Sequence, residues 1–209
     1  MLRVLLPLPY FVRLSGGSNR DANLYFVESY MNTVKNWVTA SEVETLRKAA
    51  KKTRNPTRNE LVILMLYRHG LRVSELCSIQ LDQLNLEQST LFVKRSKNGI
   101  DGMHPMAGDE LRLLRRYLRE RESELPWLFV SERGTPFARS SVNKILEQCS
   151  KSASLPRMNP HMLRHGCGFY MINNGFDIRA VQIYLGHVSI TNTAIYAKYN
   201  EKQFVGMWG

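Results

Sequence analysis

The sequence predicts a mixed α+β fold that is mainly α-helical and carries a small antiparallel β-sheet on one side. From Thr39 onwards, apolar residues recur at helical spacing in several segments that begin at capping residues and end at glycines. One segment, Thr90 to Lys94, alternates instead between apolar and polar residues, as a strand does. Asn98-Gly99 follows this segment and is a strong signal for the turn of a β-hairpin.

The N-terminal residues differ from the rest of the chain. They contain Gly16-Gly17-Ser18-Asn19 and show no sustained helical period. We therefore expect residues 1–36 to form a poorly ordered extension and residues 37–209 to form one domain. Met31 is an alternative start for the protein, because everything that the predicted fold needs lies after it.

Two helices are predicted to open the domain. Either Thr39 with Glu42 or Ser41 with Glu44 forms a capping box ahead of the first helix. A basic loop follows, and the second helix contains the segment LVILMLYRH. Because this segment is apolar nearly all round, we expect it to lie at the centre of the core. Its predicted caps are Thr57 and Glu60 at the start and Gly70 at the end.

The middle of the chain supplies a third helix, a short strand and a fourth helix. Asp109–Glu120 has the spacing of an amphipathic helix, Trp127–Val130 reads as a short buried strand, and Ser140–Ser150 is again helical. In the amphipathic helix the residues expected to face inward are Leu111, Leu114 and Leu118, and those expected to face outward are Arg112, Arg115, Arg116 and Arg119.

Three further helices are predicted near the C-terminus. Asn159 with Pro160 is a favourable helix start, and Gly175 is placed to end that helix. Asp177 begins the next one, Gly186-His187 closes it, and Ser189 begins the helix that carries Tyr196.

The charge of the chain points to a polyanionic partner. It holds 29 Lys and Arg against 18 Asp and Glu, for a net charge of +11 at pH 7. Three cysteines, at positions 77, 149 and 167, are too few and too far apart for a disulfide framework or a clustered zinc site, so a reducing cytoplasm fits. No apolar run approaches the roughly 18 residues of a membrane span. We therefore expect a cytoplasmic protein without membrane contact.

The stretch from Asn159 to Tyr199 concentrates the reactive side chains. His161 and Arg164 share one helix face, and His187 and Tyr196 follow them. A neutral phenol is a poor nucleophile at pH 7 and needs a basic, phosphate-binding pocket around it. Outside such a pocket, a pair like His161 and Arg164 is more often a satisfied polar cap than a catalytic pair. We find no acidic cluster with metal-ligand spacing, so arginine and histidine would carry the electrostatic work.

This stretch resembles the C-terminal boxes of the tyrosine recombinases, also called the phage integrase family. The family pattern H-x-L-R-H, then L-G-H and then a tyrosine, is matched by His161-Met162-Leu163-Arg164-His165, Leu185-Gly186-His187 and Tyr196. The resemblance implies that residues 37–209 are the catalytic domain. Within the family, the short chain is most like the small fimbrial phase-variation recombinases.

The resemblance also assigns two residues that lie earlier in the chain. The first arginine of the family lies in a G-L-R-x-S-E-L segment, matched here by Gly70 to Leu76, which makes it Arg72. Without the resemblance, Arg72 reads as one partner of a salt bridge with Glu75. The active-site lysine of the family lies on a β-hairpin ahead of a proline, which selects Lys97 and leaves Lys94 as the alternative.

The implied activity is site-specific DNA recombination through a 3′-phosphotyrosyl intermediate, without metal, ATP or other cofactor. Tyr196 would attack the phosphorus, Lys97 would protonate the leaving 5′ oxygen, and His161 would accept or relay the tyrosine proton. The residues implied to bind the nonbridging oxygens are Arg72, Arg164 and His187.

The implied partners are double-stranded DNA and further copies of the chain. We expect a homotetramer on paired sites, helped by DNA-bending accessory proteins at the nucleoid, that performs inversion or integration. Two alternatives stay open. A type IB topoisomerase shares the chemistry but acts as a monomer. The other alternative is a catalytically idle DNA-binding regulator, against which the intact set of six residues argues.

Overall fold

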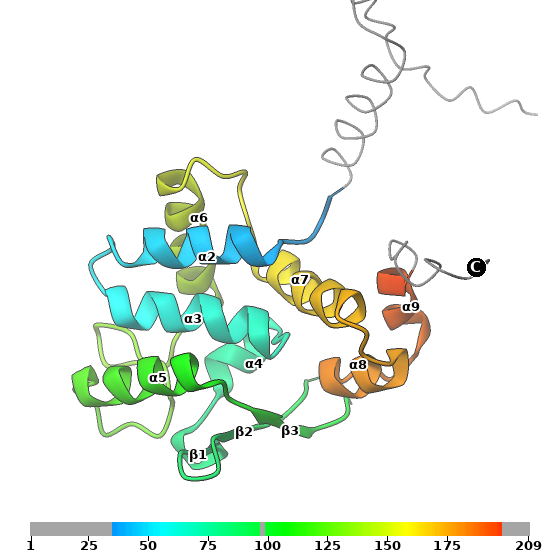
Figure 1. The fold of residues 1–209 in the computed structure, drawn as a ribbon. Helices are drawn as coiled ribbons and strands as arrows, with labels where there is room; N and C mark the ends of the chain where they lie inside the picture. The colour runs from blue at the N-terminus through cyan, green and yellow to red at the C-terminus, as the bar shows by residue number, and fades with distance from the viewer. Residues whose placement is uncertain (1–34, 97–98, 198–209) are drawn as a thin grey trace, which may run out of the picture. The chain divides into compact units, whose positions relative to one another are not determined.

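The computed structural model describes residues 35–96 and 99–197, which form a helical domain with one small sheet (Figure 1). Residues 1–34 of the predicted extension lie outside these ranges, so the division between residues 36 and 37 stays a prediction. The helices, labelled as in Figure 1, are α2 (Ala40–Ala50), α3 (Pro56–Arg68), α4 (Val73–Ser78), α5 (Gly108–Glu120), α6 (Arg139–Ser152), α7 (Pro160–Asn173), α8 (Ile178–Leu185) and α9 (Thr191–Ala197).

Helix α3 is the centre of the core, as its sequence predicts. Every residue from Leu61 to Tyr67 is buried, because α2, α5, α6 and α7 all pack against this helix. Gly70 follows α3 with a φ of +54°, a left-handed conformation that glycine adopts without strain. The chain can therefore turn sharply and bring Arg72 back toward α7.

The predicted capping box of α2 is confirmed, but the predicted start of α3 is wrong. The Thr39 hydroxyl accepts from the Glu42 amide, and the Glu42 carboxylate accepts from the Thr39 amide. Helix α3 begins before Thr57, because Pro56 occupies its first position. Proline is favourable there, since the N–H that it lacks would have no hydrogen-bond partner within the helix. The side chain of Asn55 donates to Glu132 instead of capping the helix.

The sheet lies along one side of the helices and has the order β1-β2-β3, with all neighbours antiparallel (Figure 1). A 3₁₀ turn, η1, precedes it. The predicted hairpin is confirmed, because Val93 pairs with Gly102 and Thr90 pairs with Pro105. Asn98 lies outside the described residues, so the type of turn stays a prediction. The bounds are η1 (Leu81–Gln83), β1 (Leu84–Asn85), β2 (Thr90–Val93) and β3 (Gly102–Pro105).

Two expectations for the middle of the chain need correction. Trp127–Val130 is not a strand: its ends form only isolated bridges, with Gln80 and Pro136, although Leu128 and Phe129 are fully buried. On α5 the four arginines are exposed as predicted, whereas Leu111 and Leu118 are only half-buried. The buried side chains of α5 are Glu110, Leu113, Leu114 and Tyr117.

The inner face of α5 was predicted wrongly because it includes a charged residue, Glu110. Its carboxylate is 1% exposed and lies 2.7 Å from Nε2 of His69 and 3.5 Å from the Arg68 guanidinium at the end of α3. A buried carboxylate is tolerated where it has such partners. Because the partners come from another helix, α5 on its own carries no sign that this glutamate points inward.

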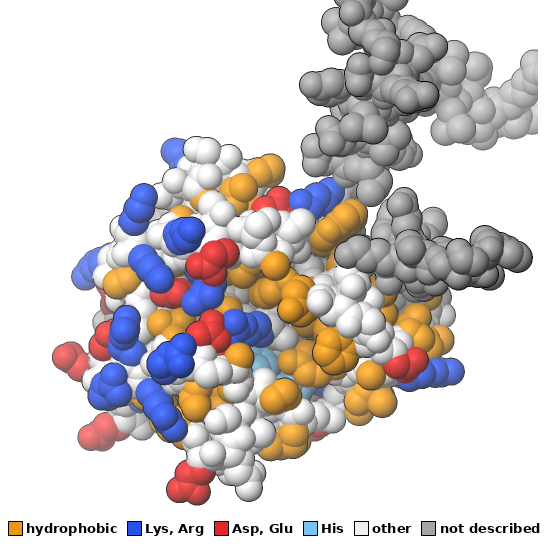
Figure 2. Space-filling model, in the orientation of Figure 1, with side chains coloured by type: hydrophobic (Ala, Val, Ile, Leu, Met, Phe, Trp, Pro, Cys, Tyr) orange, Lys and Arg blue, Asp and Glu red, His pale blue; other side chains and the backbone are white. Residues whose placement is uncertain are grey.

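The surface shown in Figure 2 divides into a charged and an apolar part. Lys and Arg alternate with Asp and Glu over α2 and α5, whereas hydrophobic side chains gather toward α7 and α8. Tyr170 on α7 and Phe176, which lies between α7 and α8, are each about half exposed. Among the described residues, no helix is long and apolar enough to cross a membrane.

Candidate active site

Arg72 is placed by the sharp turn at Gly70 and immediately precedes α4. Its side chain is 28% exposed, and its Nη1 donates to Oε1 of Glu75 over 2.6 Å. The salt bridge that the sequence suggests is therefore present. It does not compete with a role in catalysis, because it holds the guanidinium in place while leaving part of it accessible.

Glu75 is the centre of a buried cluster of arginines. Its carboxylate is 2% exposed and accepts from Arg72, from Nη1 of Arg95 at 2.9 Å and from the Ser96 amide at 3.1 Å. Arg164 approaches it to 3.8 Å. Burial alone would raise the pKa of Glu75, but the hydrogen bonds from Arg72 and the charge of Arg95 lower it to about 2. Glu75 is thus a permanent negative charge among three guanidinium groups.

Helix α7 carries the first part of the C-terminal motif. The Asn159 side chain accepts from the amides of His161 and Met162, as its sequence predicts. Arg164 lies one turn further on and is 3% exposed. Its guanidinium donates to the carbonyl oxygens of Gly70 and Leu185, the latter at 2.7 Å. Each of the two terminal nitrogens of Arg164 carries two hydrogens and uses one of them here, so each can donate one further hydrogen bond.

The turn after α8 places His187. Gly186 adopts a φ of +65°, which ends the helix and turns the chain toward α9. His187 is 8% exposed, and its Nδ1 lies 2.9 Å from the hydroxyl of Thr193. When the hydroxyl donates to Nδ1, the tautomer that results carries its proton on Nε2 and can donate to a ligand.

Tyr196 lies on α9, which begins at Thr191 rather than at Ser189. The side chain is 1% exposed and packs edge-on against Phe169, with ring centroids 5.0 Å apart. Its ring also stacks with that of His187 at 6.4 Å. Burial raises the pKa of Tyr196 to about 12, despite the nearby positive charge of Arg164. The phenol is therefore protonated at pH 7 and needs a base to become a nucleophile.

The structure brings five of the six predicted residues to one cleft. The sixth, Lys97, lies outside the described residues, as does Tyr199. The cleft has a volume of about 620 Å³ and continues toward Asn143 on α6. Its walls come from the residue before α4, from α7, from the α8–α9 turn and from α9. Its lining includes Arg72, His161, Arg164, His187 and Tyr196.

Sequence reasoning missed two residues of the site, Arg95 and His165. Arg95 has a fully buried guanidinium that donates to Glu75 and to the carbonyl oxygens of His69 and Tyr184, so it fixes the end of β2 against α8. His165 bridges Tyr196 and His161. Its position in H-x-L-R-H was the available signal. Arg95 gave none, since an arginine after a strand is ordinarily on the surface.

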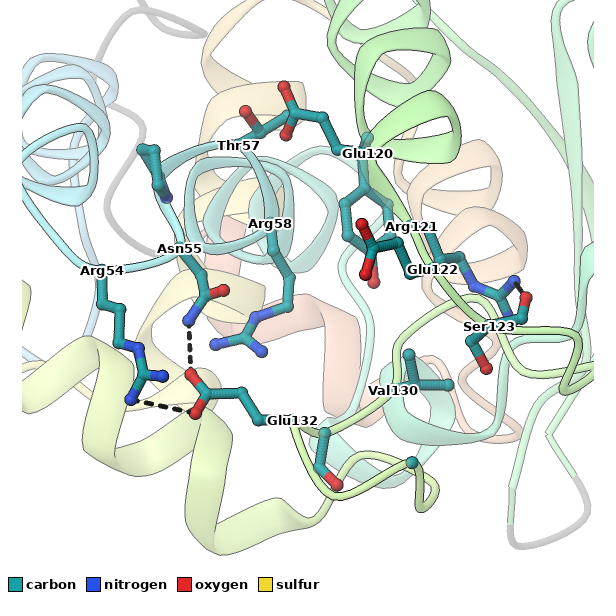
Figure 3. Close-up of a pocket in the computed structure, with 14 residues that line it drawn as sticks. Arg54, Asn55, Thr57, Arg58, Glu120, Arg121, Glu122, Ser123, Val130 and Glu132 are labelled. Atoms are coloured by element: carbon teal, nitrogen blue, oxygen red, sulfur yellow. Dashed lines mark hydrogen bonds and ion pairs between the residues drawn. The ribbon is translucent and has the colours of Figure 1, made fainter.

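A second cavity of similar size, about 590 Å³, lies between the start of α3 and the end of α5 (Figure 3). Three of its charged side chains, Arg54, Arg121 and Glu132, already have partners. Arg54 and Asn55 both bind Glu132, at 3.1 and 2.8 Å, and Arg121 donates to main-chain carbonyl groups. It contains none of the predicted site residues, so we assign the chemistry to the Tyr196 cleft.

The histidines of that cleft are held in the neutral form. Burial, followed by the charges around them, lowers the pKa of His165 and of His187 to about 4. After burial, the largest contribution to the lowered pKa comes from Arg164 for His187, and from His161 followed by Arg164 for His165. A neutral imidazole can accept a proton or donate a hydrogen bond to a phosphate oxygen. Both functions are therefore available at pH 7.

Lowering the pH from 7 to 5 is expected to destabilise the protein. An unfolded histidine binds a proton near pH 6.5, whereas folded His165 and His187 resist it down to about pH 4. The stability that they contribute is therefore present above pH 6.5 and is lost as the pH falls toward 4, by about 1–2 kcal/mol per histidine at pH 5. Urea unfolding at pH 7, 6 and 5 measures this loss. The His187→Gln variant should show a smaller one, and an unchanged urea midpoint would contradict the expectation.

Comparison with known proteins shows the family of the chain. Residues 36–203 match the model of the phage integrase family. The chain belongs to this family, the tyrosine recombinases. Its enzyme class is therefore that of the tyrosine-type site-specific DNA recombinases. The expected fold class, a mainly helical catalytic domain with a small antiparallel sheet, is confirmed as well.

Two similar family members come from Escherichia coli strain K12. The type 1 fimbriae regulatory protein FimB is 36% identical over 182 residues, which cover 85% of this chain and 91% of FimB. The type 1 fimbriae regulatory protein FimE is 32% identical over 178 residues, which cover 82% of this chain and 90% of FimE. The expected likeness to the small fimbrial recombinases is thereby confirmed.

A solved structure in the family has the same fold. The crystal structure of XerA recombinase superposes with a TM-score of 0.71 and 30% sequence identity. The match covers 82% of this chain and 63% of the XerA chain. The chain thus spans less than two thirds of the length of the XerA chain.

Proposed function

We propose that this recombinase cuts and rejoins duplex DNA with Tyr196 as the nucleophile, through a 3′-phosphotyrosyl intermediate. One observation carries the proposal: the Tyr196 hydroxyl lies 3.1 Å from an imidazole nitrogen of His165, within a cleft that two arginines and two further histidines line. A base beside the phenol and cations beside the phosphate are the two requirements for attack by a tyrosine.

The cations stabilise the charge that grows on the nonbridging oxygens. Arg72 is accessible and reaches into the cleft, and the positive charge of Arg164 is fixed by two carbonyl groups and Glu75. Burial and the charges of Arg72 and Arg95 lower the pKa of Arg164 to about 10, so it stays charged at pH 7. His187 completes the set as a donor from Nε2. Preorganised donors of this kind supply much of the catalysis in a dry site.

The proposed partners are duplex DNA and three further copies of this chain on paired sites, with accessory DNA-bending proteins. The net charge of +11 and the exposed arginines of α5 support the DNA partner. Arg139, Asn143 and Lys144 on α6 are exposed as well, and Asn143 borders the cleft beside Arg72. Inversion of a DNA segment is the outcome that the resemblance to the small fimbrial phase-variation recombinases implies, and the similarity to FimB and FimE extends over nearly their full length.

The proposed function is tested by trapping the covalent intermediate. A pool of nicked duplexes with a randomised centre serves as the substrate, because the nick lets the short 5′-hydroxyl strand diffuse away and prevents religation. We expect adducts on a denaturing gel whose recovered DNA converges on one sequence. Because guanidinium groups supply the positive charge, adduct formation should be undiminished in excess EDTA. Failure to form any adduct would refute the proposal, and adducts without sequence preference would favour a topoisomerase.

Lys97 is proposed as the general acid, which gives a second prediction. The leaving 5′ oxygen is strongly basic, so Lys97→Ala should cleave ordinary DNA about 10²–10⁴-fold more slowly. Replacing the bridging 5′ oxygen by sulfur gives a thiolate leaving group that departs without a proton. Lys97→Ala should then recover near-normal cleavage. Arg164→Ala should not recover, because its defect concerns the phosphate. Rescue of Lys94→Ala instead would move the assignment to Lys94.

A further inference from the structure

Three side chains form a continuous line from the buried tyrosine to the protein surface. The Tyr196 hydroxyl lies 3.1 Å from Nδ1 of His165, and Nε2 of His165 lies 2.9 Å from Nε2 of His161. His165 is 9% exposed, whereas His161 is an exposed residue at the mouth of the cleft. Among the described residues, the Tyr196 hydroxyl is hydrogen-bonded to His165, and His165 in turn is hydrogen-bonded to His161.

The contact between the two imidazoles couples their protonation. Two Nε2 atoms at 2.9 Å form a hydrogen bond only when one of them carries a proton and the other does not. When the proton is on His165, its Nδ1 is free to accept the proton of Tyr196. When the proton is on His161, the Nδ1 of a neutral His165 carries a proton and donates to the tyrosine oxygen. The two arrangements correspond to the tyrosine before and after it loses its proton.

We propose that His165 takes the proton from Tyr196 during attack and that His161 passes a proton on to solvent. This inference rests on Tyr196 as the nucleophile, and it adds a catalytic residue to the six that the sequence suggests. His165 directly contacts the reacting atom, and His161 is the outlet of the relay.

The atoms and charges of the step balance. A lone pair on the tyrosine oxygen forms the bond to phosphorus while the hydroxyl proton moves to Nδ1 of His165. The Nε2 proton of His165 moves to Nε2 of His161, so His165 stays neutral and His161 becomes the imidazolium. His161 then releases its Nδ1 proton to solvent. The bond from phosphorus to the 5′ oxygen breaks, and that oxygen takes a proton from the general acid.

The surroundings of His165 keep the relay in its neutral, proton-accepting form. Burial, the neighbouring imidazole and Arg164 lower the pKa of His165, and burial with Arg164 and Arg72 lowers that of His161. A phosphate in the cleft would oppose these charges, which makes proton uptake easier once substrate is bound. The ionisable groups that face the relay are His161 and Arg164 on α7, Arg72 before α4, His187 before α9 and Tyr196 on α9.

The packing of α9 on α7 fixes the geometry of the tyrosine. A Cβ atom at Gly168 would lie 2.5 Å from Cε2 and Cζ of the Tyr196 ring, so only glycine lets the ring approach α7 this closely. Phe169 supports the ring from the next position. Since Gly168 lies within one turn of His165 on the same helix, the hydroxyl is held beside Nδ1 by packing and not by the hydrogen bond alone.

The experiment compares two variants of the relay with the unchanged protein in the adduct assay. Asparagine at position 165 can bind the tyrosine hydroxyl but cannot transfer a proton. We expect His165→Asn to slow single-turnover adduct formation at pH 7 by about 10²–10⁴-fold. Its rate should rise with hydroxide concentration up to pH 9, whereas the unchanged protein reaches a plateau near neutral pH. His161→Gln should show the same defect to a lesser degree, because a water molecule can accept the proton from His165 in place of His161.

Controls separate this inference from folding and from the proposed function. Gel-shift affinity and the urea midpoint at pH 8 should be similar in His165→Asn and the unchanged protein, and 5′-thio DNA should not rescue the variant. If His165→Asn keeps the rate and pH profile of the unchanged protein, the relay is refuted. If the unchanged protein forms no adduct, the proposed function is refuted, and the relay is then tested by histidine ¹⁵N NMR alone.

Histidine ¹⁵N NMR on the unchanged protein tests the relay without a substitution. The inference requires that, near pH 7, His165 carries its proton on Nε2 and has an unprotonated Nδ1. The His165 signals are assigned by their absence in His165→Asn. The expected tautomer supports the relay, and a proton resident on Nδ1 of His165 overturns it.

Discussion

Tyr196→Phe is expected to bind DNA as the unchanged protein does and to form no covalent adduct. The substitution removes only the hydroxyl, so the ring can keep its contacts with Phe169 and His187. The loss of one buried hydrogen bond, to His165, should lower the free energy of unfolding by about 1 kcal/mol. Adduct formation, by contrast, should vanish, because the nucleophilic oxygen is gone.

The nicked-duplex assay with a matched control decides this prediction. Tyr199→Phe removes a neighbouring phenol and should form adducts at the rate of the unchanged protein. Gel-shift titration of both variants checks that DNA binding is intact. An adduct that persists in Tyr196→Phe, or that disappears in Tyr199→Phe, would transfer the role of nucleophile to another residue.

Glu75→Gln should cause the second large effect, on stability and on cleavage together. Glutamine keeps the shape of the side chain but removes the negative charge among Arg72, Arg95 and Arg164. Leaving buried cations without their counter-charge typically costs about 3–5 kcal/mol. The guanidinium groups should also separate from one another, so adduct formation should fall by at least about 10²-fold.

Urea unfolding of Glu75→Gln measures this effect, and Glu44→Gln serves as the control. The Glu44 carboxylate also binds an arginine, Arg47 at 2.9 Å, but its side chain is 48% exposed. An exposed pair of this kind contributes about 0–1 kcal/mol. Equal and small effects of the two substitutions would show that Glu75 does not hold the arginine cluster together.

Glu75, like the histidines, should make the folded protein less stable as the pH falls, but over a lower pH range. Its folded pKa, about 2, is below the usual value for a glutamate. The stability that it contributes is therefore present above about pH 4.5 and is lost as the pH falls toward 2. Measurements between pH 7 and 5 thus report mainly on the histidines, and the pH series in Glu75→Gln should differ mainly below that range.

Local signals predicted those parts of the fold that depend on neighbouring residues. Thr39 caps α2 and Asn159 caps α7, because a capping side chain binds amides within its own first turn. Gly70 and Gly186 end helices with positive φ, a property of the residue itself. The prediction of the inner face of α5 failed because a distant partner decides it: Glu110 is buried where His69 lies opposite.

The sequence by itself determined which chemistry the chain carries. The family motifs contain Arg72, His161, Arg164, His187 and Tyr196 in order, and their spacing along the chain does not depend on the fold. The tertiary structure decided how these groups are held. The cluster around Glu75 includes Arg95, which no motif marks, and the imidazole that lies beside the Tyr196 hydroxyl is that of His165. Both depend on burial and on contacts between segments far apart in the chain, because only packing sets which side chains lose water and which charges then need a partner.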